Sequence, residues 1–305
     1  MLFPAGYIIN AKNINIEKLS LYQKAWQLEL VQIEKGISRS NISAVHTPNI
    51  QLGLSINSKG MIIQGAFPYG ARLLYTIDSS NSITINNEIR TTQELHISSH
   101  KSELDVIFTG CSSSYTIAVG EKLIQESFYQ YYGVEIDDYL QDNRLYIKPE
   151  KLLFFYAGLK KWIDYLNNKE DIKISYYDIE HAILRHIYHC ITFKKEKKQR
   201  NKFQVSKLRD FLHNNIMNPI KILDISQELN MSERQLHASF KQTYGISPKK
   251  YLQNIRLNKI RATLLTKQEK NISDIAFQYN FTHMSLFSNV YKKMFQELPS
   301  ETLQR

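Results

Sequence analysis

The last hundred residues contain one small unit twice, about fifty residues apart, and this repeat limits the possible folds more than any other feature. The offset between the copies is 50 residues before the turn inside each copy and 51 after it, so the second copy has one extra turn residue. Each copy predicts a short helix, a tight turn and a second helix with a polar, partly basic outer face. Two such units suit two successive major grooves of DNA. The matching segments are Ile225-Ser226 and Ile275-Ala276, Leu236-x-x-x-Phe240-Lys241 and Phe287-x-x-x-Tyr291-Lys292, and Gly245-Ile246-Ser247-Pro248 and Gln296-Glu297-Leu298-Pro299.

Helix-start signals recur where two such units require them. Ser232 followed by Gln235 predicts a capping box, and Ser247-Pro248 places a cap before a proline at the first helical position. Asn271 with Asp274 gives the same signal for the second unit. Between the units, residues 248–266 carry an apolar stripe too wide for a helix that rests on one neighbour. We therefore expect a helix of about 28 Å, packed by one unit at each end, which is compatible with the roughly 34 Å turn of B-DNA.

Charge is distributed unevenly along the chain. Residues 194–305 hold 21 Lys and Arg against 9 Asp and Glu, whereas residues 1–193 hold 18 against 20. A basic segment joined to a near-neutral one is typical of a polyanion-binding domain attached to another domain. The alternative is a solvated basic surface that only keeps the protein soluble.

The first part of the chain predicts about eight short strands between turn residues, which indicates an antiparallel β barrel or sandwich. From about Gly120 the pattern becomes helical, with helices expected from Pro149 to Leu166 and from Tyr176 to Phe193. These two helices either cover the barrel or pair with a second subunit, and the two roles are compatible. The expected strands are Trp26 to Ile33, Ile50 to Ile56, Met61 to Phe67, Leu73 to Ile77, Ser82 to Ile85, Leu95 to Ile97, Leu104 to Phe108 and Tyr115 to Val119.

These patterns predict an α+β chain of two domains. Residues 1–193 form a sensing and dimerisation domain, β-rich to about residue 120 and helical over 121–193. Residues 194–202, dense in charge and without an apolar period, form a basic linker. Residues 203–305 form an all-α domain with helix-turn-helix units at about 222–243 and 271–294.

The C-terminal third resembles the DNA-binding domain of the AraC/XylS family of bacterial transcriptional regulators. In that family the first domain is often a cupin-like barrel that senses a ligand and dimerises, and the N-terminal domain here resembles it in layout only. In that family, the second helix of each unit enters the major groove. The matching residues are Ser232, Arg234, Leu236, Phe240-Lys241, Gly245-Ile246-Ser247-Pro248, Tyr251, Arg256-Leu257, Leu264-Leu265, Ile275-Ala276, Phe281, Phe287-Ser288, Tyr291-Lys292-Lys293-Met294-Phe295 and Pro299.

Carried over by position, the resemblance places the reading helices at about Ser232 to Thr243 and His283 to Met294. Arg234 suits guanine, Asn289 suits adenine, and Lys241, Lys292 and Lys293 are expected to meet phosphates. The first unit is expected to supply more of the specificity and the second more of the anchoring. The predicted DNA-binding residues are Arg234, His237, Ala238, Lys241, Ser285, Ser288, Asn289, Lys292 and Lys293.

The chain departs from the family at several positions. Ala238 and Asn289 stand where arginine is usual, so Ala238 is expected to read bases by contact with a thymine methyl group. Asn230, Asn280 and Gln296 stand where glycine is usual. Asparagine tolerates the left-handed conformation, whereas Gln296 predicts a looser final connection.

Other chemistry finds little support. His181, His186, His189 and Cys190 share a predicted helix but do not converge on one face, so they are interpreted as buried or interface side chains. The sequence contains no phosphate loop, nucleophile elbow or His-Glu-x-x-His pattern, and we expect no enzyme activity, cofactor or metal.

We therefore expect a cytoplasmic, sequence-specific transcriptional regulator, activation being favoured by family resemblance. Its expected partners are promoter double-stranded DNA, a second copy in a homodimer, a small-molecule or lipid effector of unknown identity and, by resemblance, RNA polymerase, with no membrane. The alternative is a nonspecific architectural DNA-binding protein.

Overall fold

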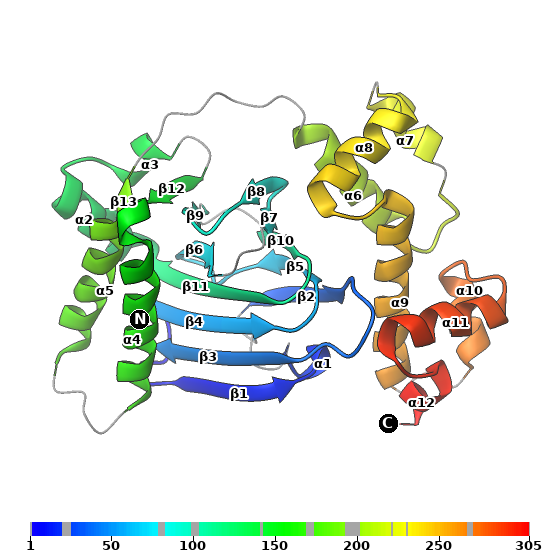
Figure 1. The fold of residues 1–305 in the computed structure, drawn as a ribbon, viewed down its shortest axis with the longest axis horizontal. Helices are drawn as coiled ribbons and strands as arrows, with labels where there is room; N and C mark the ends of the chain where they lie inside the picture. Colours follow the sequence, from blue (N-terminus) through cyan, green and yellow to red (C-terminus); the bar gives the residue numbers. More distant parts are fainter. Residues whose placement is uncertain are drawn as a thin grey trace.

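The computed structural model describes residues 2–19, 26–78, 83–98, 104–140, 143–168, 174–192, 202–220, 222–229, 231–266 and 271–304. The predicted fold class is confirmed, because an antiparallel β domain with accessory helices precedes a helical domain with two helix-turn-helix units (Figure 1). Most of the predicted linker lies outside the described residues, and its last residue, Lys202, begins helix α6. Among the described residues, the helices are too short or too polar to cross a membrane.

The larger sheet of the N-terminal domain has the strand order β1-β3-β4-β11-β6-β9-β12-β13. Its neighbouring strands are antiparallel, with β4 and β6 flanking the long central strand β11. Alternate residues of β11, such as Tyr115 and Ile117, join one buried cluster, while Ala118 joins another on the opposite face. The strands are β1 (Ile8–Ile14), β3 (Ser40–His46), β4 (Ile50–Asn57), β6 (Ala71–Ile77), β9 (Glu94–Ile97), β11 (Ser112–Gly120), β12 (Arg144–Ile147) and β13 (Ile191–Thr192).

The smaller sheet has the order β2-β5-β10-β7-β8 and contributes to a core shared with the larger sheet. Along β10, Leu104, Val106 and Phe108 face this shared core, whereas Asp105 and Ile107 point to the outer face. Both faces of the strand are therefore buried. The strands are β2 (Gln27–Gln32), β5 (Met61–Ala66), β7 (Ile83–Ile85), β8 (Glu88–Arg90) and β10 (Leu104–Phe108).

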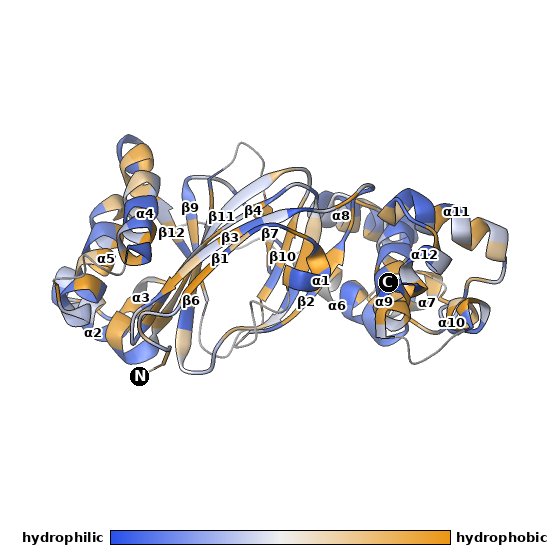
Figure 2. Ribbon diagram, turned by 90° about the horizontal axis from the view of Figure 1, so that it is seen from below, coloured by the Kyte–Doolittle hydropathy of each residue, from blue (hydrophilic) through white to orange (hydrophobic). Residues whose placement is uncertain are grey.

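Three longer helices of the N-terminal domain lie at the end of the sheets away from the C-terminal domain (Figures 1 and 2). Their apolar stripes belong to the same buried cluster as β4 and β11, so the expected covering of the β domain is observed. Gly158 of α4 allows His186 of α5 to approach, since a Cβ there would lie 2.2 Å from the imidazole ring. The helices are α2 (Glu121–Tyr132), α4 (Leu152–Asn167) and α5 (Tyr176–Cys190), with the short α1 (Ile16–Leu19), α3 (Ile136–Tyr139) and η2 (Pro149–Lys151).

Strands β1, β3 and β8 are absent from the sequence prediction, and the interval 121–193 is not helical throughout. Strand β12 pairs with β9 inside that interval, and Ile191 pairs with Ile147 at the point where α5 was expected to continue. Helix α5 ends at Cys190 because the following residues form β13. The polar composition of β1 and β3, with five asparagines and serines in the two strands combined, conceals their strand character.

The C-terminal domain has two separate cores joined by one helix. The first core gathers α6, α7 and α8 against the start of α9, and the second gathers α10 and α11 against its end. Leu252 of α9 belongs to the first core and Leu264 to the second, as the wide apolar stripe predicted. The helices are α6 (Lys202–Asn214), α7 (Ile222–Glu228), α8 (Glu233–Tyr244), α9 (Pro248–Thr266), α10 (Ile272–Gln278), α11 (Met284–Phe295) and α12 (Pro299–Leu303).

The outer face of the smaller sheet carries the first of these two cores. Val31, Ile33, Ile62 and Ile107 belong to the same buried cluster as Leu208 of α6, Phe240 of α8 and Tyr251 of α9. Figures 1 and 2 show the C-terminal domain against this end of the β domain, opposite α4 and α5. The first unit therefore shares a core with the sheet, whereas the second unit keeps a core of its own.

Two neighbouring isoleucines on β5 test this arrangement. Ile62 is fully buried in the core shared by the two domains, whereas Ile63 points into the β domain. We expect Ile62→Ala to speed amide hydrogen exchange in α8 and α9, because truncating a buried isoleucine costs about 2–5 kcal/mol at the place where it packs. Ile63→Ala is the matched control and should speed exchange in the β domain first. Equal effects of both changes on α8 and α9 would contradict the shared core.

Candidate nucleic-acid interface

Helix α8 is fixed at both ends by the residues that the sequence singled out. Ser232 Oγ accepts a hydrogen bond from Gln235 N at 3.3 Å, and Gln235 Oε1 accepts from Ser232 N at 3.1 Å, which completes the predicted capping box. At the other end, Gly245 adopts a left-handed φ of 71° and donates to the carbonyl of Lys241 at 2.9 Å. Leu236, Phe240 and Tyr244 form the buried side of α8.

The second unit repeats this arrangement with different chemistry. Asn271 Oδ1 accepts from Ser273 N at 3.0 Å and caps α10, and Asn280 in the turn adopts a left-handed φ of 61°. His283 precedes α11 without a side-chain hydrogen bond at the N-cap. Asn230, the corresponding turn residue of the first unit, lies outside the described residues.

The last turn differs from the sequence prediction of a looser connection. Gln296 adopts a φ of 61°, and its backbone N donates to the carbonyl of Lys292 at 2.8 Å, as Gly245 does to Lys241. Its side chain also donates to the Lys293 carbonyl at 3.3 Å. The turn closes because α12 and the second core hold the chain on both sides, and the conformational strain falls on Gln296.

The predicted DNA-contacting residues lie on the sides of α8 and α11 that face away from the two cores. Their side chains are available to a ligand, and His237 and Ser288 are the two that are partly covered. The fully exposed members are Arg234, Ala238, Lys241, Ser285, Asn289, Lys292 and Lys293.

The sequence hypothesis omits one exposed residue of the second reading helix. Leu286 is 59% exposed and lies between Ser285 and the buried Phe287 in the first turn of α11. Its counterpart in the first unit is Gln235, since the two helices correspond with an offset of 51. The sequence signal for Leu286 is that an apolar residue in the second unit occupies the position that a capping glutamine occupies in the first unit.

Helix α9 also fastens the reading units to the β domain, through the edge strand β2. The Asn258 side chain accepts from Gln32 N at 3.2 Å and donates to the Gln32 carbonyl at 3.1 Å, as a neighbouring strand would. One turn earlier, Asn254 donates to the carbonyl of Ile33 at 3.2 Å. Gly36 N donates to the carbonyl of Met294 at 3.1 Å, which adds a polar contact to the second unit.

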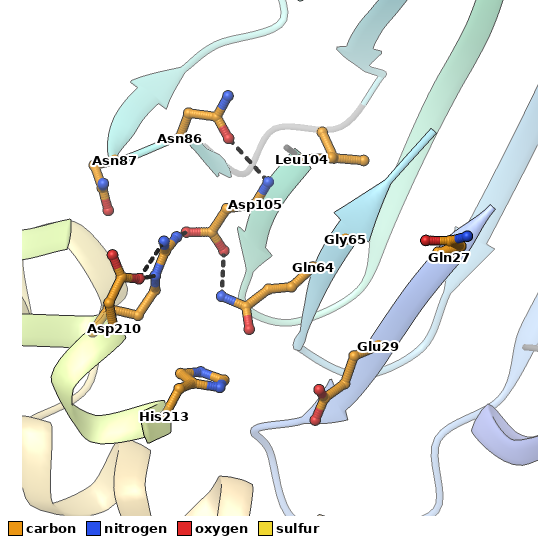
Figure 3. Close-up of a pocket in the computed structure, with 11 residues that line it drawn as sticks. Gln27, Glu29, Gln64, Gly65, Asn86, Asn87, Leu104, Asp105, Asp210 and His213 are labelled. Atoms are coloured by element: carbon orange, nitrogen blue, oxygen red, sulfur yellow. Dashed lines mark hydrogen bonds and ion pairs between the residues drawn. The ribbon is translucent and has the colours of Figure 1, made fainter. Parts of the chain in front are cut away.

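A buried ion pair joins the sheet to α6 (Figure 3). Arg209 donates to Asp105 Oδ2 and, through Nη2, to Asp210 at 2.6 Å, while Gln64 donates to Asp105 Oδ1 at 3.1 Å. Burial raises the pKa of Asp105 above its ordinary value, and the charge of Arg209 opposes that rise. A polar cavity of about 480 Å³ lies beside the pair and is lined by both domains, including Glu29 and His213 (Figure 3).

Further contacts hold the C-terminal end of α8 to strand β7 and to the turn between β7 and β8. Thr84 Oγ1 donates to the carbonyl of Thr243 at 2.6 Å, and the Tyr244 hydroxyl donates to Asn87. These bonds lie at the far end of α8 from Arg234. Helix α8 is thus anchored at its C-terminus while its N-terminal half is exposed.

Comparisons with known proteins agree with this geometry. A helix-turn-helix domain family matches residues 225–305. The XylDLEGF operon transcriptional activator of Pseudomonas putida is 34% identical over 97 residues, which are 31% of this chain and 30% of the relative. The activator RhaS of Escherichia coli is 23% identical over 229 residues, which are 65% of this chain and 80% of the relative.

A solved structure of a probable AraC family transcriptional regulator from Rhodopseudomonas palustris is 28% identical, covers 34% of this chain and 96% of its own, and has a TM-score of 0.33. The C-terminal domain of this chain is therefore a helix-turn-helix domain of the DNA-binding kind, with two units. It is similar to the corresponding domains of transcriptional activators of the AraC/XylS kind. The chain spans less than a third of the length of the first relative, so the resemblance concerns this domain.

Replacing Gln296 tests the strain in the last turn. Gln296→Gly should raise the free energy of unfolding by about 1 kcal/mol, because glycine takes a left-handed φ without steric cost. Gly245→Ala is the reciprocal change at the matching turn and should lower the free energy by about the same amount, since a Cβ there meets only an ordinary contact with Thr109. Denaturant unfolding measures both. A decrease for Gln296→Gly would show that the glutamine side chain stabilises the turn.

Proposed function

We propose that the protein is a sequence-specific DNA-binding transcriptional regulator of the AraC/XylS kind that acts as an activator. The observation that carries this proposal is the pair of exposed reading helices, α8 and α11, held at the two ends of α9. The relatives named above are activators, and activation of transcription is transferred from them as part of the proposal. Contact with RNA polymerase, which the family resemblance of the sequence implies, belongs to the same proposal.

Each exposed side chain receives a role from its chemistry. Arg234 at the start of α8 reads guanine with its two-pronged guanidinium group, and Asn289 of α11 reads adenine. Ala238 contacts a thymine methyl group, and His237, Ser285 and Ser288 line the same surfaces. Lys241, Lys292 and Lys293 lie near the ends of the two helices and neutralise phosphates.

A pair of substitutions separates base reading from phosphate contact. Arg234→Ala should relax the preference at one or two base pairs in one half of the site, by about 1–3 kcal/mol at that position. Lys292→Ala should weaken binding to all sequences about equally and reduce the salt slope by about 1. Binding titrations on variant duplexes at several salt concentrations measure both. Identical effects of the two changes would show that the assignment is wrong.

Footprinting on the DNA upstream of the protein's own gene tests the function itself. A specific regulator protects a defined window made of two segments about one helical turn apart, also in the presence of competitor DNA. A uniform ladder without a protected window would instead support a nonspecific architectural protein, which binds all duplexes with similar affinity.

We infer that an effector, a small molecule or a lipid, acts through the β domain. A cavity of about 60 Å³ lies between the two sheets, and Leu28, Ile63 and Leu104 line it from β2, β5 and β10. The residues adjacent to these three lie on the opposite face of the sheet, toward the C-terminal domain. They are Glu29, Ile62 and Asp105. An effector that enlarges the cavity displaces these strands and with them the first reading unit, which shifts promoter occupancy.

The same domain is proposed to form a homodimer through α4 and α5. Leu153, Phe154 and Tyr177 are 87%, 54% and 66% exposed on these helices, at the end of the molecule away from the reading units. A second copy that covers this apolar surface leaves both pairs of reading helices free for DNA. The helices then have both roles that the sequence left open.

A charge placed in this apolar surface tests the dimer. Leu153→Glu should shift the protein to monomers in sedimentation at micromolar concentration, because an unpaired carboxylate is costly inside an interface. Ile89→Glu is the matched control, since Ile89 is also exposed, at 48%, but lies on β8. Unchanged sedimentation of Leu153→Glu would place the interface elsewhere.

A further inference from the structure

The residue at the third position of α11 has no evident role in stabilising its own helix. In α8 the corresponding Gln235 closes a capping box, and in α12 the third residue, Glu301, accepts from Leu298 N at 2.5 Å. In α11 this position is Leu286, which makes no such bond and is 59% exposed. The helix thereby forgoes a cap and leaves apolar surface in water. A local departure of this kind is expected at functional sites rather than at random.

The position of Leu286 on α11 indicates which part of the DNA its side chain contacts. In a helix-turn-helix unit, residues at the N-terminal end of the second helix contact base edges in the major groove. Leu286 is in the first turn of α11, and Asn289, three residues later, lies beside it on the exposed surface. Phe287 points into the second core and fixes the rotation of the helix, so Leu286 stays outside.

The chemistry of the groove then selects one base. Among the four bases, thymine alone presents a methyl group in the major groove, at C5, and the nitrogen and oxygen groups of the base edges there are hydrogen-bond donors or acceptors. A leucine pressed against a donor or acceptor would leave that group without its water, whereas against a methyl group it loses nothing. We propose that Leu286 is a specificity-determining residue that reads a thymine methyl group in the half-site of the second unit.

This inference rests on the proposed DNA-binding function. It assigns part of the sequence specificity to the second unit, which the sequence predicts mainly to anchor the protein. The second unit does not only anchor the protein through Lys292 and Lys293. With Leu286 for thymine and the neighbouring Asn289 for adenine, it selects a half-site that contains A·T pairs. The first unit cannot use its third position in this way, because Gln235 is folded back onto Ser232.

The test removes one methyl group from the DNA and one side chain from the protein. A binding site is first selected from random duplexes with the full chain, and each thymine in it is then replaced in turn by deoxyuridine. One replacement in the second half-site should weaken wild-type binding about fourfold, the value of one buried methyl group. Leu286→Ala should bind the thymine and deoxyuridine duplexes equally. Placing 5-methylcytosine at that position, opposite guanine, should restore part of the methyl contact relative to cytosine.

Leu223→Ala is the matched control, because Leu223 is 48% exposed on α7, outside the reading helices, and this variant should keep the full preference for thymine. Circular dichroism verifies that both variants are folded. If Leu286→Ala retains the wild-type preference for thymine, or if wild-type binding is insensitive to every thymine of the second half-site, the inference is overturned. If no sequence is enriched in the selection, the proposed function fails first, and the two failures are thereby distinguished.

Discussion

The packing of the first helix-turn-helix unit on the outer face of the smaller sheet is the interaction on which the rest of the structure depends. Val31, Ile62 and Ile107 alternate with residues of the inner core along β2, β5 and β10, so one sheet belongs to two cores. Burying such side chains contributes about 1.5–3 kcal/mol each. The Asp105–Arg209 pair fixes the orientation of α6 on the sheet and adds little net stability, because Asp105 is buried and Arg209 is partly withdrawn from water.

This arrangement gives the proposed effector response a physical route from the β domain to the reading helices. The second unit has a core of its own and meets the β domain through polar contacts at Gly36 and Gln32. The position of the second unit relative to the first is therefore set mainly by α9, which belongs to both cores. A change in the sheet therefore reaches the first unit directly and the second through α9.

The sequence predicts the C-terminal domain well and the contact between the domains hardly at all. Ser232 with Gln235 and the stripe of α9 are local signals, and the structure confirms both. The run Met61-Ile62-Ile63 has no apolar alternation, so the pattern cannot show that its two faces belong to different cores. Strands β1 and β3 escape prediction because polar residues make up half of their combined length. The resemblance predicts Ser285, Ser288 and Asn289 as the contacts of the second unit. Only the rotation of α11 shows that the side chain of Leu286 is exposed on the same surface.

In the free protein, the shared core holds the first reading unit rigidly on the sheet. Spin labels at Tyr69, which is 91% exposed, and at the exposed Gln227 of α7 measure this distance directly, after Cys111→Ser removes the exposed native thiol. Double electron–electron resonance should give one narrow distance distribution, which broadens when Ile62→Ala is introduced. A broad distribution in the otherwise unaltered chain would contradict the account, because it would mean that the shared core does not hold the two domains together.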